Sequence, residues 1–137
     1  VTRLLDMGIE PYLVASSVMG FIAQRLVRVI CAACKESRPV EPGVAEEFGV
    51  APADVPKTLA SGRGCGACKG TGFKGRTAIY EFLLLIEPIQ QLFLKLTSSH
   101  EIAQAAQRLD KMRTLRQDGW EKIRLGLTTP QEVLRVT

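Results

Sequence analysis

Four cysteines are the residues of this chain whose type and spacing most clearly predict chemistry. They form two Cys-x-x-Cys pairs, Cys31 with Cys34 and Cys65 with Cys68, with thirty residues between the pairs. Each pair lets two thiolates converge on one ion, and two pairs complete a tetrahedral set of four sulfur ligands. The pattern predicts a structural zinc site, although disulfides, redox dithiols and iron–sulfur clusters use the same residue type.

The predicted site is structural rather than catalytic. A zinc ion closed by four sulfurs leaves no position for an activated water, and a coordinated thiolate cannot attack a substrate. The glycines in GRGCGACKGTGFKG are explained by tight turns around sulfur ligands. The sequence holds no GxxxxGK[ST] phosphate-binding loop. We therefore expect neither catalytic nor cofactor-binding residues within this chain.

Two segments with alternating apolar side chains flank the cysteine pairs. Residues 21–30 read FIAQRLVRVI and residues 75–85 read GRTAIYEFLLL, and both patterns predict a β-strand. The simplest arrangement is an antiparallel strand pair with the zinc lobe extending from its end. The segment between the cysteines is rich in proline and glycine, so metal binding would supply folding free energy that apolar packing cannot.

The remaining elements are predicted to be helices. One runs from Pro11 to about Met19, and residues 1–8 have the pattern of a helix end closed by a glycine. Residues 87–137 predict four short helices, the second and fourth introduced by the capping-box spacings of Ser98 with Glu101 and Thr129 with Glu132. The predicted class is therefore α+β.

Composition describes a globular chain with a modest basic excess. The 137 residues carry a net charge of +4 and 46% of them are hydrophobic. No apolar run approaches the ~20 residues that cross a bilayer. The N-terminus shows neither an initiator methionine nor a cleavable signal, so we expect a piece of a longer protein. Arg25 falls with the apolar set of the first strand, so it lies either at a solvated edge or opposite an acidic or phosphate group, and no motif assigns Arg25 or Arg28 to a nucleotide.

The chain resembles the C-terminal part of the secretion ATPases of the type II secretion and type IV pilus assembly family (general secretory pathway protein E type). The most specific pieces are AQRLVR at 23–28, the two cysteine pairs, GRTAIYE at 75–81 and the tail GLTTPQEVLRVT. The resemblance implies that the four cysteines bind a structural Zn²⁺. It implies the end of a RecA-like ATPase domain at 1–30, the zinc-binding lobe at 31–74, a returning strand at 75–86 and a C-terminal helical subdomain at 87–137.

The same resemblance implies a cytoplasmic hexamer, peripheral to the bacterial inner membrane, that couples ATP hydrolysis to protein export or to pilus or pseudopilus assembly. ATP and Mg²⁺ would bind only to the full-length parent, so this chain alone is predicted to be inactive. The expected partners are neighbouring ring subunits and the inner-membrane platform protein, with membrane association only through partners and no nucleic acid. The residues do not distinguish type II secretion from pilus assembly.

Two other functions fit the cysteines. The stretch CGACKGTG, residues 65–72, matches the zinc knuckle of J-domain co-chaperones, which bind unfolded polypeptide but carry four such units where this chain has one. A zinc ribbon that binds nucleic acid agrees with the pI near 9.0. However, only 6% of the residues are aromatic, which leaves few platforms for stacking bases.

Overall fold

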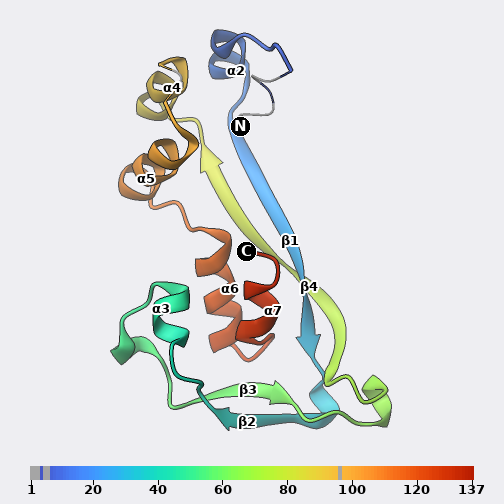
Figure 1. Ribbon diagram of the computed structural model, residues 1–137. Helices are drawn as coiled ribbons and strands as arrows, with labels where there is room; N and C mark the ends of the chain where they lie inside the picture. The colour runs from blue at the N-terminus through green and yellow to red at the C-terminus, as the bar shows by residue number, and fades with distance from the viewer. Residues whose placement is uncertain (1–3, 5–6, 96) are drawn as a thin grey trace. The chain divides into compact units, whose positions relative to one another are not determined.

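The computed structural model describes residues 4, 7–95 and 97–137, so most of the helix end predicted at 1–8 lies outside the described residues. The chain divides into two compact units, residues 1–23 with 81–114 and residues 24–80 with 115–137. The division falls within two long strands, β1 (Gly20–Ile30) and β4 (Phe73–Leu84), which pair antiparallel (Figure 1). The mixed helix and strand content confirms the α+β class.

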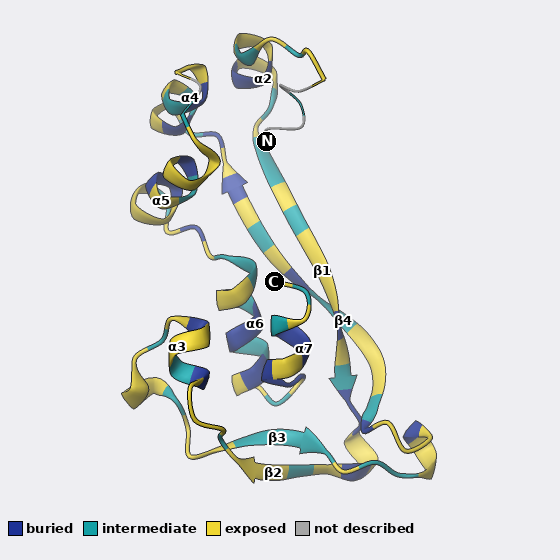
Figure 2. Ribbon diagram, viewed as in Figure 1, coloured by how far each residue is buried: buried dark blue, intermediate teal, exposed yellow. Residues whose placement is uncertain are grey.

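Both strands predicted from alternation are present, and alternation also predicts which side chains are buried. Val27 and Ile79 are fully buried, whereas the adjacent Leu26 and Tyr80 are 49% and 48% exposed. Figure 2 shows this change from residue to residue along β1 and β4. Successive side chains of a strand point to opposite faces, so the buried residues mark the face that packs against the core.

The first unit contains three described helices of four residues or more: α2 (Pro11–Ser17), α4 (Glu87–Leu94) and α5 (Ser99–Leu109). The capping box predicted for α5 is confirmed, because the Glu101 amide donates to Ser98 Oγ and the Ser98 amide donates to Glu101 Oε2. No helix among the described residues is long and apolar enough to cross a membrane. The core of this unit is apolar: Val14, Leu83, Leu85, Ile89, Phe93, Ile102, Ala105, Ala106 and Met112.

The second unit combines a hairpin with short helices. Strands β2 (Lys35–Pro39) and β3 (Thr58–Gly62) pair antiparallel, and α3 (Val44–Phe48) lies between them in sequence. The C-terminal helices are α6 (Leu115–Arg124) and α7 (Pro130–Leu134), and single 3-10 turns lie at 32–34, 52–54 and 66–68. The apolar core is small: Val27, Val44, Phe48, Ile79, Trp120, Ile123 and Val133.

Within the second unit, the C-terminal segment bonds to the edges of both long strands. The Ile30 amide donates to the carbonyl of Leu127 at 2.9 Å, and Thr128 Oγ1 donates to the carbonyl of Arg28 at 2.8 Å. On β4, the Tyr80 amide donates to Asp118 Oδ2 at 2.9 Å. These partners satisfy backbone groups that would otherwise leave a strand edge open.

The capping box predicted at the start of α7 is wrong. The helix begins at Pro130 as expected, but the Thr129 side chain makes no capping hydrogen bond. The Glu132 carboxylate instead pairs with Arg28 and Arg135. A buried carboxylate gains more from two guanidinium groups than from one backbone amide, because hydrogen bonds between charged groups are the stronger ones.

Candidate metal centre

The structure brings the sulfurs of all four predicted cysteines into one cluster. The Sγ–Sγ distances are 3.8 Å for Cys65 and Cys68, 3.9 Å for Cys34 and Cys68, and 4.0 Å for Cys31 and Cys65. All four sulfurs lie within 4.8 Å of one another. A tetrahedron with zinc–sulfur bonds of about 2.3 Å has edges of about 3.8 Å, so the cluster fits one zinc ion. The sulfurs are too far apart for disulfides, whose bonds measure about 2.05 Å.

Each cysteine pair is positioned by a strand end and a 3-10 turn. Cys31 directly follows β1, and its carbonyl accepts a hydrogen bond from the Cys34 amide at 3.1 Å. Cys65 follows β3 after two residues, and its carbonyl accepts from the Cys68 amide at 3.2 Å. Each turn folds the second sulfur back toward the first, which is what the two-residue spacing requires.

Glycines hold the two cysteine turns close together. The Cys31 amide donates to the carbonyl of Gly72 at 2.9 Å, and the Arg63 amide donates to the carbonyl of Cys34 at 3.0 Å. A Cβ atom on Gly62 would lie 2.0 Å from the Gly72 oxygen, so any side chain there would separate the two segments. Gly72 has φ of 76°, in the left-handed region that favours glycine.

Among the cysteines of the cluster, Cys68 has the surroundings that most favour the ionised thiolate. Its sulfur accepts the backbone amides of Cys65 and Gly72, both at 3.2 Å, and the amide of Cys65 is the main reason why the pKa of Cys68 falls to about 6. Burial raises the pKa of the Cys34 thiol to about 12. Four adjacent thiolates would repel one another, so a cation at the centre is what would allow all four sulfurs to ionise.

Comparison with known proteins identifies the family. The family described as "Type II/IV secretion system protein" matches residues 1–135. This chain belongs to that family. The resemblance inferred from the cysteine pairs and their flanking segments is therefore confirmed.

Relatives named for type II secretion and for type IV pilus assembly match the whole chain. The type II secretion system protein E of Pseudomonas aeruginosa is 44% identical over 137 residues, and the type II secretion system ATPase E of Vibrio cholerae is 40% identical over 139. The type IV pilus assembly ATPase PilB of Thermus thermophilus is 39% identical over 138 residues. Each match covers 100% of this chain but only 27%, 27% and 15% of the respective relative. The chain thus spans about a quarter or less of these proteins.

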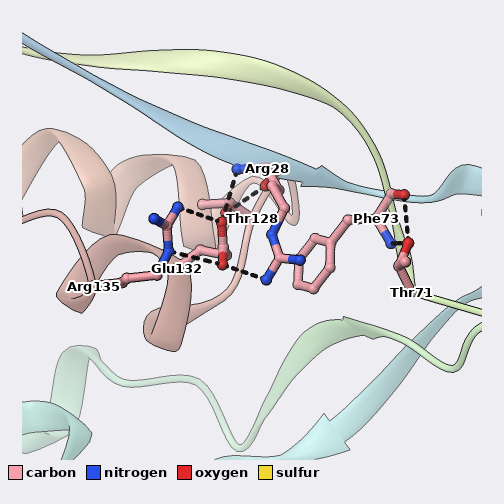
Figure 3. Close-up of polar contacts among 6 residues, drawn as sticks. All are labelled: Arg28, Thr71, Phe73, Thr128, Glu132 and Arg135. Carbon is pink, nitrogen blue, oxygen red and sulfur yellow. Dashed lines mark hydrogen bonds and ion pairs between the residues drawn. The ribbon is translucent and has the colours of Figure 1, made fainter.

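Of the two arginines singled out on β1, the structure pairs Arg28 with an acidic group. Arg28 Nη2 lies 2.6 Å from Glu132 Oε1, and the Arg28 amide donates to Glu132 Oε2 at 3.1 Å (Figure 3). The side chain of Arg25 is exposed and donates to the carbonyl of Gln24 at 3.0 Å.

Sequence reasoning missed Glu132 as a member of this charged cluster. The residue is only 3% exposed although it is ionisable, and Arg135 Nη2 also donates to its Oε2 at 3.1 Å. The hydrogen bond from Arg28 is the main cause that lowers the pKa of Glu132 to about 2. In the sequence, the three-residue spacing of Glu132 and Arg135 could indicate only the ion pair between those two side chains. The contact with Arg28, 104 positions away in sequence, depends on tertiary folding.

Proposed function

We propose that this chain is the zinc-binding C-terminal segment of a hexameric secretion or pilus-assembly ATPase. The observation that carries the proposal is a four-sulfur cluster with tetrahedral spacing in a member of the type II/IV secretion family. Two of the relatives are named as ATPases. Bonds from one zinc ion to Cys31, Cys34, Cys65 and Cys68 would hold together the two ends of the segment between β1 and β4. They would add folding free energy where the apolar core is small.

The strands are proposed to complete a RecA-like domain of the full-length protein, with residues 1–30 and 75–86 as its end. Both units expose apolar side chains on these strands. Ile22 and Phe82 in the first unit are 63% and 48% exposed, and Leu26 and Tyr80 in the second unit are exposed by about half. Apolar side chains grouped in this way indicate a surface that another element covers. In the parent ATPase that element is the preceding part of the domain, which would bind ATP and Mg²⁺; this chain alone would not hydrolyse ATP.

The lobe at 31–74 and the helical subdomain at 87–137 are proposed to contact neighbouring ring subunits or the inner-membrane platform protein. This assignment follows from the family, whose named members belong to secretion and pilus-assembly machines. The protein would act in the cytoplasm, at the inner membrane through its partners and without nucleic acid. The family match covers both cysteine pairs, which favours this function over a chaperone knuckle or a nucleic-acid ribbon.

Metal analysis combined with one ligand substitution tests the zinc assignment. We expect one zinc per chain in the purified full-length protein, and Cys65→Ser should lose more than half of it because three sulfurs hold the ion less tightly. Ala67→Ser is the matched control, since it adds the same hydroxyl at an exposed position between Cys65 and Cys68. Less than half an equivalent of zinc in the unmodified protein would contradict the assignment.

Two further measurements test the proposed ATPase activity and the proposed platform partner. The full-length protein should hydrolyse ATP as a hexamer, and Cys65→Ser should lower that activity while Ala67→Ser preserves it. The assembled hexamer should also capture the cytoplasmic domain of a platform protein. Hexamers that hydrolyse ATP but capture no platform domain would contradict the partner assignment alone.

A further inference from the structure

The side chain of Arg28 lies between the ring of Phe73 and the carboxylate of Glu132 on α7. Its guanidinium carbon is 4.3 Å from the centre of the Phe73 ring on one side, and Nη2 is 2.6 Å from Glu132 Oε1 on the other (Figure 3). A guanidinium group over an aromatic ring is held by the negative face of the ring. One side chain thus contacts the first residue of β4 and the middle of α7.

Phe73 is fixed by the cysteine turn that precedes it. Thr71 Oγ1 donates to the carbonyl of Cys68 at 2.7 Å and accepts the Phe73 amide at 3.3 Å. Between these two residues, the Gly72 amide donates to the sulfur of Cys68 at 3.2 Å. The backbone from which the Phe73 ring projects therefore depends on the conformation of the Cys65–Cys68 turn.

Glu132 anchors α7 through the same arginine. The helix is only five residues long, too short to be stable by itself, so its position depends on tertiary contacts. Its buried carboxylate accepts both the amide and the guanidinium of Arg28, and Arg135 binds the same carboxylate. Loss of the ordered guanidinium would leave Glu132 buried with a weaker set of partners.

We propose that Arg28 is a positioning residue that couples metal occupancy of the cysteine cluster to the ordering of helix α7. Metal binding fixes the turn at Cys68, the turn fixes the Phe73 ring, and the ring holds the guanidinium that binds Glu132. Because coupling is reciprocal, the factor by which zinc stabilises the ordered α7 is also the factor by which an ordered α7 tightens zinc binding, so changes at Glu132 must alter zinc affinity. This inference rests on the proposed zinc site and adds that the metal controls a surface beyond its own lobe.

A double-mutant cycle on zinc affinity tests the coupling in the full-length protein, with a chromophoric chelator as competitor. Phe73→Leu removes the ring face and keeps an apolar side chain, and Glu132→Gln removes the charge at the other end. A cation–π contact contributes about 0.5–2 kcal/mol, so either change, by interrupting the path through this contact, should weaken zinc binding about 2-fold to 30-fold. The double variant should lose no more than the larger single loss, because both changes interrupt one path. Arg28→Lys replaces Glu132→Gln if that variant fails to fold.

Matched controls and a second readout separate coupling from general destabilisation. Leu109→Ala at the end of α5 and Glu121→Gln on α6 change exposed side chains and should leave zinc affinity within 2-fold. In the zinc-loaded protein, Phe73→Leu should raise amide hydrogen exchange in α7 at least 3-fold and leave α5 unchanged.

Three results would overturn the inference. Multiplicative losses in the double variant would show that the two ends act independently, and unchanged zinc affinity in both single variants would show that no coupling exists. Either result leaves the zinc site itself intact. A protein that binds no zinc would overturn the coupling together with the proposed function.

Discussion

The two compact units of this chain are stabilised in different ways. In the first, helices α2, α4 and α5 enclose an apolar cluster around Ile89 and Phe93, which are 0% and 1% exposed. In the second, a smaller apolar core is accompanied by four clustered sulfurs and by the buried carboxylate of Glu132. The comparison shows how a segment rich in proline and glycine can be ordered: metal and charge contacts replace apolar area that its sequence does not provide.

Removal of the metal should destabilise the second unit much more than the first. Structural zinc sites bind with about 10–16 kcal/mol, so chelation should expose the amides of β2, β3 and α3 to hydrogen exchange. The amides of α4 and α5 should keep most of their protection, because all four candidate metal ligands lie in the second unit. Equal loss of protection in both units would show that they unfold together.

The reverse test removes apolar packing from the first unit. Phe93 is buried and stacks on Phe21 with ring centres 6.4 Å apart. Phe93→Ala should lower the free energy of unfolding by about 3–5 kcal/mol, measured by denaturant titration of the zinc-loaded protein. Leu109→Ala, at a position 57% exposed at the end of α5, is the control and should cost less than about 1 kcal/mol. A comparable loss for both variants would be evidence against a core centred on Phe93.

Glu132 makes the stability of the second unit sensitive to acid. Its pKa falls from 4.5 to about 2 on folding, so its contribution is complete above pH 4.5 and is lost as the pH falls toward 2. The shift corresponds to about 3 kcal/mol at neutral pH. The difference in unfolding free energy between the natural protein and Glu132→Gln should shrink over that range.

Glu121→Gln provides the control for this pH dependence. Glu121 is 47% exposed and lies 3.5 Å from Arg124, a pair that water screens. Its substitution should change stability by less than about 1 kcal/mol at any pH. A pH-independent difference between the natural protein and Glu132→Gln would contradict the buried ion pair.

The smallest effect concerns the contact between α6 and α7. A Cβ atom on Gly119 would lie 2.4 Å from Val133 Cγ1, and the branched valine side chain has little freedom to move. Overpacking costs about 1–3 kcal/mol, of which alanine recovers up to about 1 kcal/mol through helix propensity. Gly119→Ala should therefore destabilise the second unit by up to about 2 kcal/mol in thermal unfolding. Gly66→Ala, which meets no atom within 4 Å, should have little effect.

Local patterns predicted the elements that follow from periodicity and spacing. Strands β1 and β4 follow from alternating apolar residues, the box at Ser98 follows from its glutamate three positions later, and the cysteine cluster follows from two Cys-x-x-Cys pairs. In each of these cases the partners are close in sequence or their chemistry leaves few alternatives.

The sequence did not predict features that depend on distant contacts. The β2–β3 hairpin consists of the segments KESRP and TLASG, which are short, mostly polar and separated by eighteen residues. The approach of Gly62 to Gly72 is visible only after both turns are folded. Glu132 has the sequence spacing of a capping-box residue. Only the folded position of Arg28 shows why its carboxylate binds a guanidinium group instead of capping the helix.

X-ray absorption at the zinc edge of the purified full-length protein distinguishes a closed four-sulfur site from other metal sites. One zinc per chain, surrounded by four sulfur atoms at about 2.3 Å, is the expected result. Nitrogen or oxygen ligands at about 2.0–2.2 Å, or a protein that holds no zinc, would contradict the assignment of Cys31, Cys34, Cys65 and Cys68 as a closed metal site.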